Sequence, residues 1–233
     1  MEICFHKVRQ LKNIRRHLMK LRLQPIRVFC LHHVSPAFDA DSMYKNDWMA
    51  LDKFQEKVLQ MQSKGVEFVS ISDAYRHVCK DLVRWRKYAV LTFDDGYASL
   101  KDVLPWLMER SIPVTLFING KYLDGVSYRE KMGERYLTKQ ELFALDSPNV
   151  EIGSHGWEHI DATKQALEEF AESLSQNIEQ LSVHPRYVPF HAYTWGKHNL
   201  ATDAMLQKHG IVPVLSDGVK NFNDKFYIHR ELL

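Results

Sequence analysis

Two acidic side chains stand next to each other in Asp94-Asp95-Gly96, directly after the apolar run 89–93. If that run is a strand, successive side chains point to opposite sides, so the two carboxylates meet different surroundings. One could then bind a cation while the other holds a water molecule. A polar turn explains the same three residues equally well, so the segment needs a second observation beside it.

Two histidines are spaced four residues apart in His155-Gly-Trp-Glu-His159. Neutral imidazole nitrogens suit zinc, cobalt or nickel. Together with one Asp they would leave coordination positions open for water and substrate, as in a catalytic site. A solvated helix face also produces such spacing by chance. The HExxH arrangement of metalloproteases is excluded, because Glu158 precedes the second histidine and does not follow the first.

The elements that must position these groups alternate between strands and helices from residue 25 onward. Strands are expected at 27–31, 66–70, 89–93, 113–118, 150–153, 187–190, 211–215 and 226–229. Helices are expected at 48–63, from Ser72 as cap to 79, after Gly96 to 110, at 138–146 with a Thr138/Glu141 capping box, at 163–181 and at 199–209. This alternation predicts an α/β fold of parallel strands joined by helical crossovers, either a barrel or an open doubly wound sheet. Polar clusters at 32–33, 94–95 and 155 follow three of these strands, at the edge where active sites of such folds lie.

Taken together, the segments Thr92-Phe93-Asp94-Asp95-Gly96 and Ser154-His155-Gly-Trp-Glu-His159 resemble polysaccharide deacetylases with NodB homology, carbohydrate esterase family four. The resemblance covers about residues 27–230. It implies a distorted (β/α) barrel of about seven parallel strands. It also implies that Asp94 is the general base and that Asp95, His155 and His159 bind a divalent cation, Zn²⁺ before Co²⁺ or Ni²⁺.

Other segments extend the resemblance to one branch of this family. Residues 31–36 are similar to its Y-H-x-V-S segment, and residues 191–196 approximate F-A-Y-P-Y-G. The second similarity implies that the backbone N–H of Trp195 faces the oxyanion and that Tyr193 and Trp195 lie beside the sugar. Thr194 replaces the family's Pro, and Gly156 replaces its usual Ser or Thr.

Two further roles follow from the same branch. Arg230 is similar to the Arg that holds the base carboxylate. The late L-x-x-x-H segment that supplies the general acid in many relatives is not found, and His32 is the best substitute, with His191 and His229 as weaker candidates.

The rest of the composition sets the context. A net charge of +2 over 233 residues argues against a nucleic-acid partner. Residues 7–24 predict a basic amphipathic helix that either packs on the domain or contacts an anionic membrane surface or an acidic partner. This helix divides the chain into 1–24 and a catalytic domain at 25–233. Three dispersed cysteines indicate neither a disulfide framework nor a thiol zinc site. With no secretory signal or membrane-spanning run recognised, a cytoplasmic location is expected, with membrane association left open.

The expected activity is removal of N-acetyl groups from an amino sugar in a polysaccharide, glycan or glycan precursor. An O-acetyl esterase acting through the same metal site is one alternative. A catalytically inactive relative that only binds glycans is the other.

Overall fold

The computed structural model describes residues 24–36, 48–80, 86–124, 135–222 and 224–233. The basic helix predicted at 7–24 lies, except for its last residue, outside the described residues, and its contact with a membrane therefore stays a prediction. No helix in the described ranges is long and apolar enough to cross a bilayer.

The core of the molecule is a nine-stranded sheet in which every strand pairing is parallel. Its order is β10 (Ile228–His229), β9 (Val212–Leu215), β8 (Tyr187–Ala192), β7 (Val150–Ser154), β6 (Val114–Ile118), β5 (Lys87–Phe93), β1 (Arg27–Leu31) and β11 (Glu231–Leu232). β4 (Val66–Phe68) pairs with the start of β5 beside this path.

The sheet closes into a barrel through the last strand segment. β10 and β11 occupy the two ends of the strand order, yet only Arg230 separates them in the chain. Counted as one strand, they complete a path of seven, and β4 adds an eighth. The predicted parallel (β/α) barrel is confirmed, and the open doubly wound sheet is excluded.

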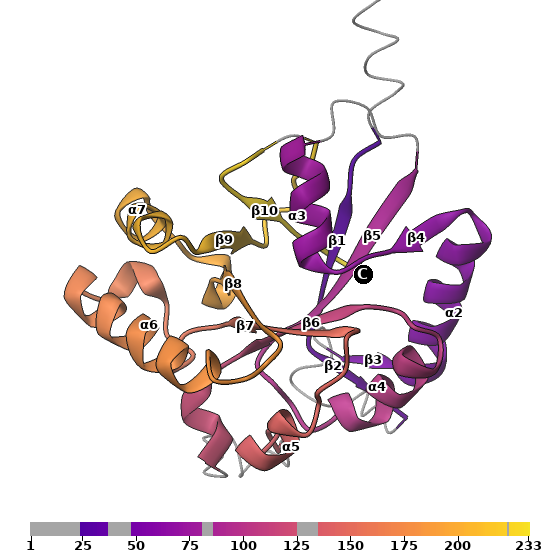
Figure 1. The fold of residues 1–233 in the computed structure, drawn as a ribbon, viewed down its shortest axis with the longest axis horizontal. Helices are drawn as coiled ribbons and strands as arrows, with labels where there is room; N and C mark the ends of the chain where they lie inside the picture. The colour runs from indigo at the N-terminus through magenta and orange to yellow at the C-terminus, as the bar shows by residue number, and fades with distance from the viewer. Residues whose placement is uncertain (1–23, 37–47, 81–85, 125–134, 223) are drawn as a thin grey trace, which may run out of the picture.

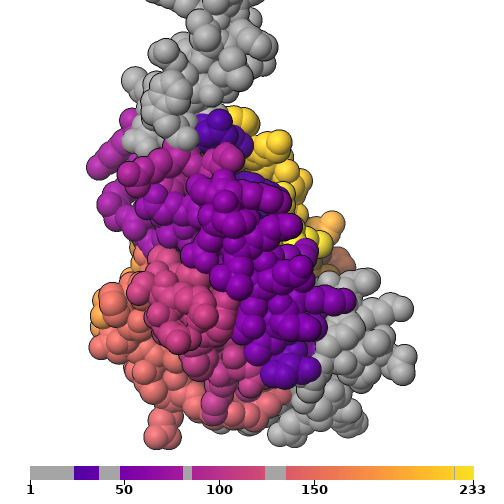
Figure 2. All heavy atoms as spheres, turned by 90° about the vertical axis from the view of Figure 1, so that its right-hand side faces the viewer, coloured from indigo at the N-terminus to yellow at the C-terminus, as the bar shows by residue number. Residues whose placement is uncertain are grey.

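Helices surround the strands, with α6 (Leu167–Leu181) and α7 (Leu200–Lys208) on one side and α2 (Leu51–Ser63) and α4 (Leu100–Glu109) on the other (Figure 1). The remaining helices are α3 (Ile71–Lys80) and α5 (Lys139–Phe143), with 3-10 turns η1 (Gly120–Asp124), η3 (Ala162–Lys164) and η4 (Thr194–Gly196). Seen from outside, the purple residues of 48–80 and the magenta residues near α4 cover much of one face (Figure 2).

Three local predictions need correction. Residues 48–50 form β3 (Trp48–Ala50), which pairs with β2 (His33–Ser35), so the helix begins only at Leu51. The cap of α3 is Ser70 and not Ser72, because the Ser70 hydroxyl accepts a hydrogen bond from the Asp73 N–H at 3.1 Å. The long helix begins at Leu167 after the separate turn η3. The Thr138/Glu141 capping box is confirmed.

The packing shows which side chains of β1 and β5 face the barrel interior. Val28 and Val90 belong to one buried apolar cluster, whereas Phe29 and Leu91 belong to another. Because strand side chains alternate with a period of two, the positions 28, 30 and 32 of one chain segment and 90, 92 and 94 of the other share the first side. The alternation therefore directs Cys30, His32, Thr92 and Asp94 toward one region.

Candidate active site and metal centre

A cavity of about 330 Å³ opens at the carboxyl ends of the strands. It is lined by every predicted site residue except Arg230: His32, Asp94, Asp95, His155, His159, Tyr193 and Trp195. Segments more than a hundred residues apart in the chain thus meet at one place, as expected for a parallel barrel.

The turn after β5 aims the two carboxylates differently. Asp94 continues the strand, whereas Asp95 has a left-handed backbone with φ of 69° and Gly96 follows at φ of 83°. Such backbone strain in a non-glycine residue is held where surrounding structure enforces it, commonly at active sites. A Cβ at position 96 would also come within 2.9 Å of the terminal methyl of Ile118, but the positive φ is the main reason that glycine is favoured there.

Asp95, His155 and His159 form a compact group of potential metal ligands. The Nε2 atoms of both histidines lie 3.3 Å from Asp95 Oδ1, and the potential ligand atoms of the group lie within 4.8 Å of one another. Asp95 Oδ1 is buried and has no hydrogen-bond partner among the described residues. A buried carboxylate oxygen without a partner is costly, and a cation bound there would satisfy it. The donor set therefore fits a divalent metal.

The tautomer of His155 suits this role. Its Nδ1 lies 2.7 Å from the backbone carbonyl of Ala192, which can only accept a hydrogen bond. Nδ1 therefore carries the proton, and Nε2 presents its lone pair to the cavity. Asn119 holds the same loop in place, because its Nδ2 donates to the backbone carbonyls of His155 at 2.7 Å and Gly156 at 3.1 Å.

The surroundings of His159 differ. The indole Nε1–H of Trp195 donates to His159 Nδ1 at 2.7 Å. A neutral His159 that accepts at Nδ1 carries its proton on Nε2, the nitrogen that faces Asp95. If His159 held a cation through Nε2, its proton would have to reside on Nδ1, which could then no longer accept from the indole. Trp195 is 66% exposed, so its ring has room to turn away.

Arg230 lies behind Asp94 and holds its carboxylate at both oxygens. The two N···O distances are 2.6 and 2.8 Å, and the guanidinium is 1% exposed. It also donates to the hydroxyls of Thr92 and Ser216 at 3.1 and 2.9 Å. The break between β10 and β11 places this residue at the point where the barrel closes, and its predicted position beside the base carboxylate agrees with the geometry.

Electrostatics keep the two carboxylates of this cluster ionised. Burial by itself raises the pKa of Asp94, but the charges of Arg230 and then His155 oppose it and lower the pKa to about 2. Burial likewise acts against ionised Asp95, yet the imidazoles of His155 and His159 outweigh it and hold the pKa of this carboxyl well below its usual range. Burial lowers the pKa of His155 and its carboxylate neighbours raise it, with a net increase.

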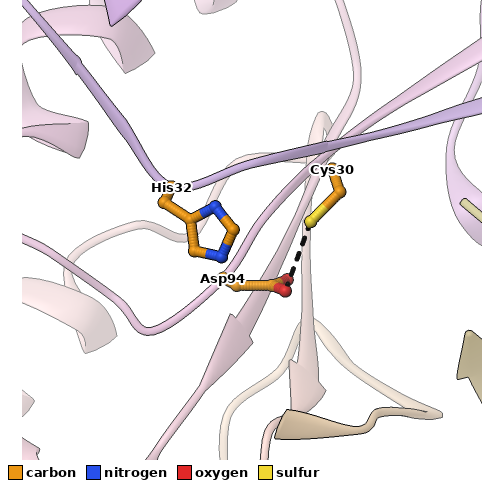
Figure 3. A group of neighbouring side chains, drawn as sticks. All are labelled: Cys30, His32 and Asp94. Atoms are coloured by element: carbon orange, nitrogen blue, oxygen red, sulfur yellow. Dashed lines mark hydrogen bonds between the residues drawn. The ribbon is translucent and has the colours of Figure 1, made fainter. Parts of the chain in front are cut away.

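Geometry separates the three candidates for the general acid. His32 lines the cavity with its ring beside the carboxylate of Asp94 (Figure 3). His191 is 2% exposed behind Ser154, and burial lowers its pKa to about 3, so it stays neutral. His229 faces Asp217 at 2.8 Å and does not line the cavity.

The loop Tyr193–Gly196 contains the predicted oxyanion and sugar contacts. Trp195 has a left-handed φ of 59°, and the hydroxyl of Thr194 donates to the carbonyl of Ile160 at 2.6 Å. At the position where the family motif has Pro, Thr194 thus joins this loop to the segment that contains His159. Tyr193 lines the cavity but is 1% exposed, and its hydroxyl donates to Asp203 at 2.9 Å. Trp195 thus offers the more accessible ring for a sugar.

Sequence reasoning missed several residues of this site. Cys30 lies with its Sγ 3.4 Å from Asp94 Oδ2, and Asn177 of α6 donates to Ser154 Oγ at 2.8 Å and to the Ile118 carbonyl at 3.0 Å. Asn119 follows β6 directly, so the rule that chemistry gathers at strand ends could have found it. Gly156 has φ of 82°, which explains glycine where relatives have Ser or Thr.

A parallel (β/α) barrel with an Asp-His-His group and a second carboxylate at its mouth defines a NodB-type hydrolase fold. The family model for polysaccharide deacetylase matches residues 83–214, more than half of the chain. The chain therefore belongs to the polysaccharide deacetylase family, as the resemblance of its motifs predicted.

Solved structures share the fold at low sequence identity. IcaB from Ammonifex degensii is 21% identical with a TM-score of 0.75, and the match covers 91% of this chain and 93% of that one. The deacetylase PplD of Streptococcus pyogenes is 17% identical with a TM-score of 0.73, covering 91% and 93%. A de-N-acetylase from Aggregatibacter actinomycetemcomitans is 17% identical with a TM-score of 0.72, covering 90% and 95%. A search of curated protein sequences finds no match.

Proposed function

We propose that this protein is a metal-dependent hydrolase that removes N-acetyl groups from an amino sugar in a polysaccharide, glycan or glycan precursor. Asp95, His155 and His159 hold the divalent cation, with Zn²⁺ first and Co²⁺ or Ni²⁺ as alternatives. Membership of the deacetylase family supports the reaction class, and one relative of the same fold is named a de-N-acetylase. PplD was solved in complex with acetate, the product of either N- or O-deacetylation.

The observation that carries the proposal is the pair of unlike carboxylates. Asp95 Oδ1 is buried without a hydrogen-bond partner beside two imidazole nitrogens, while Asp94 is held at both oxygens by Arg230. The first carboxylate suits a cation and the second suits proton transfer. Hydrolysis of an amide by a metal-activated water requires both a cation ligand and a separate proton acceptor.

The chain's own groups account for the remaining chemistry. A bound divalent cation would polarise the acetyl carbonyl and lower the pKa of a water molecule. Asp94, kept ionised by Arg230, takes a proton from the water as the water oxygen bonds to the acetyl carbon. The backbone N–H of Trp195 donates to the developing oxyanion, a contact worth about 3–4 kcal/mol. His32 gives a proton to the nitrogen as the C–N bond breaks, which leaves acetate and a free amine.

Acetate release from matched N-acetylated and O-acetylated sugars tests the proposal. We expect release from the N-acetylated set, loss on chelation and recovery when Zn²⁺, Co²⁺ or Ni²⁺ is added back. Release only from O-acetylated sugars would show the esterase alternative, and sugar binding without any release would show an inactive glycan-binding protein.

Two variants at adjacent positions separate the roles of the carboxylates. Asp94→Asn should lose turnover and still bind metal in calorimetry, whereas Asp95→Asn should lose both. Asp146→Asn is the matched control, because this carboxylate pairs with Arg186 at the surface and does not line the cavity. Turnover that survives either Asp94→Asn or chelation would contradict the mechanism.

A further inference from the structure

A second group of potential ligands lies beside the first in the same cavity. It consists of Cys30, His32 and Asp94, whose potential ligand atoms lie within 4.8 Å of one another. Figure 3 shows the thiol and the imidazole directed toward the same carboxylate. The Sγ of Cys30 lies 3.4 Å from Asp94 Oδ2. The parallel pairing of β1 with β5 produces this cluster, because Cys30 is in register with Thr92 and the inward positions recur every second residue.

We propose that Cys30, His32 and Asp94 form a second cation site that takes a thiophilic divalent cation such as Zn²⁺ or Cd²⁺. A thiolate and an imidazole favour these ions over Mg²⁺ or Ca²⁺, which prefer oxygen ligands. Three protein ligands leave a fourth position for water, as in other open zinc sites. Binding replaces the S–H bond with a sulfur–metal bond, and the thiol proton leaves to solvent.

The arrangement around Asp94 is compatible with such a ligand. Each of its oxygens accepts one hydrogen bond from Arg230, and each carboxylate oxygen has a second lone pair. A guanidinium behind a ligating carboxylate orients it, as outer-shell partners of metal sites commonly do. The charges of thiolate and carboxylate balance the cation itself, which leaves the single charge of Arg230 in excess.

Occupation of this site has a functional consequence that rests on the proposed deacetylase activity. The cation engages Asp94 and His32, the groups assigned to accept and donate protons, and shares no ligand with the group Asp95, His155 and His159. One equivalent of zinc should therefore activate the enzyme, whereas excess zinc should inhibit it.

Cadmium absorption tests the site without any substrate. With the first site saturated by Zn²⁺, Cd²⁺ is added to the full-length protein and the thiolate-to-cadmium charge-transfer band is recorded in the ultraviolet. Cys30→Ser should lose the band at low cadmium, because a hydroxyl is a poor ligand for a soft ion. Cys79→Ser, which removes a thiol that does not line the cavity, should keep it. An identical band in the Cys30→Ser protein would overturn the site.

Inhibition by excess Zn²⁺ tests the consequence. Because Cys30 contacts the proposed base Asp94, the inhibition of each protein is expressed relative to its own acetate release without excess zinc. The zinc concentration that half-inhibits Cys30→Ser should be ~10–100-fold higher than for the wild type, or more. Loss of an outer-shell partner already weakens metal binding by this factor, and Cys30 is a direct ligand in the proposed site. Equal inhibition of the wild-type and Cys30→Ser proteins would overturn the inhibitory role. If no acetate is released by any protein while the cadmium band still depends on Cys30, the proposed function fails and the cation site stands.

Discussion

Replacement of Arg230 by Met should destabilise the protein by about 4 kcal/mol at neutral pH. The guanidinium is 1% exposed and bonded to both oxygens of a buried carboxylate. Removing one partner of a buried pair costs about 3–5 kcal/mol, because the other charge stays buried without compensation. Part of this can be traced to Asp94, whose pKa is lowered from 3.8 to about 2, a change equivalent to about 2 kcal/mol. The lost hydrogen bonds to Thr92 and Ser216 add to it.

Urea and thermal unfolding of chelator-treated protein measure this effect. At about 2–4 °C per kcal/mol for a chain of this size, the melting temperature should fall by roughly 8–16 °C. Arg27→Met is the matched control. Arg27 also pairs with a carboxylate, Glu231, at 2.7 Å, but the side chains are 51% and 32% exposed, so its loss should cost about 0–1 kcal/mol. Combining Arg230→Met with Asp94→Asn should restore most of the stability, because neither buried charge remains.

The stability difference between the wild type and Arg230→Met should depend on pH. In the wild type, the lowered pKa of Asp94 contributes stability that is present above pH 3.8 and is lost as the pH falls through about 2. Without Arg230, the largest influence that lowers the pKa of Asp94 is gone, so the pKa of this buried carboxyl rises relative to the wild type. The variant should therefore be weakest at neutral pH and approach the wild type on acidification. An Arg230→Met protein within 1 kcal/mol of the wild type at pH 7 would refute the reasoning.

Three other predictions concern residues around the site. Burial lowers the pKa of His191 to about 3, so its neutral form contributes stability that is present above pH 6.5 and falls by about 1.4 kcal/mol per pH unit below it. Between pH 7 and 5, the free energy of unfolding in urea should therefore fall by about 2 kcal/mol more for the wild type than for His191→Asn. A variant at exposed His209 should behave like the wild type. Zinc titration should change the fluorescence of Trp195 as its hydrogen bond to His159 breaks, and Trp195→Phe should bind zinc about fivefold more tightly because about 1 kcal/mol is no longer spent on that bond; unchanged affinity would contradict this. Asn119→Ala removes both hydrogen bonds to the histidine loop and should weaken zinc binding in calorimetry by ~10–100-fold, whereas unaltered binding would show that the loop holds its shape alone.

Local patterns predicted most of the helices and strands and the group of potential metal ligands. Buried parallel strands are continuous apolar runs, so 89–93 and 113–118 were recognisable by composition. The Thr138/Glu141 capping box depends on residues three apart and was predicted correctly. The start of the helix at 48 was wrong, because β3 forms only through its pairing with β2.

The amino-acid sequence alone determined the alternation of strands and helices, the family and the identities of the candidate metal ligands, since each depends on residues close together in the chain. The sequence motifs could not show that Cys30 lies beside His32 and Asp94, or that Trp195 donates a hydrogen bond to His159. Nor could they show that the strands on either side of Arg230 close the barrel. Those contacts depend on the register between strands far apart in sequence. A register is chosen by the packing of the whole core, and a shift of one residue would turn each of these side chains to the opposite side.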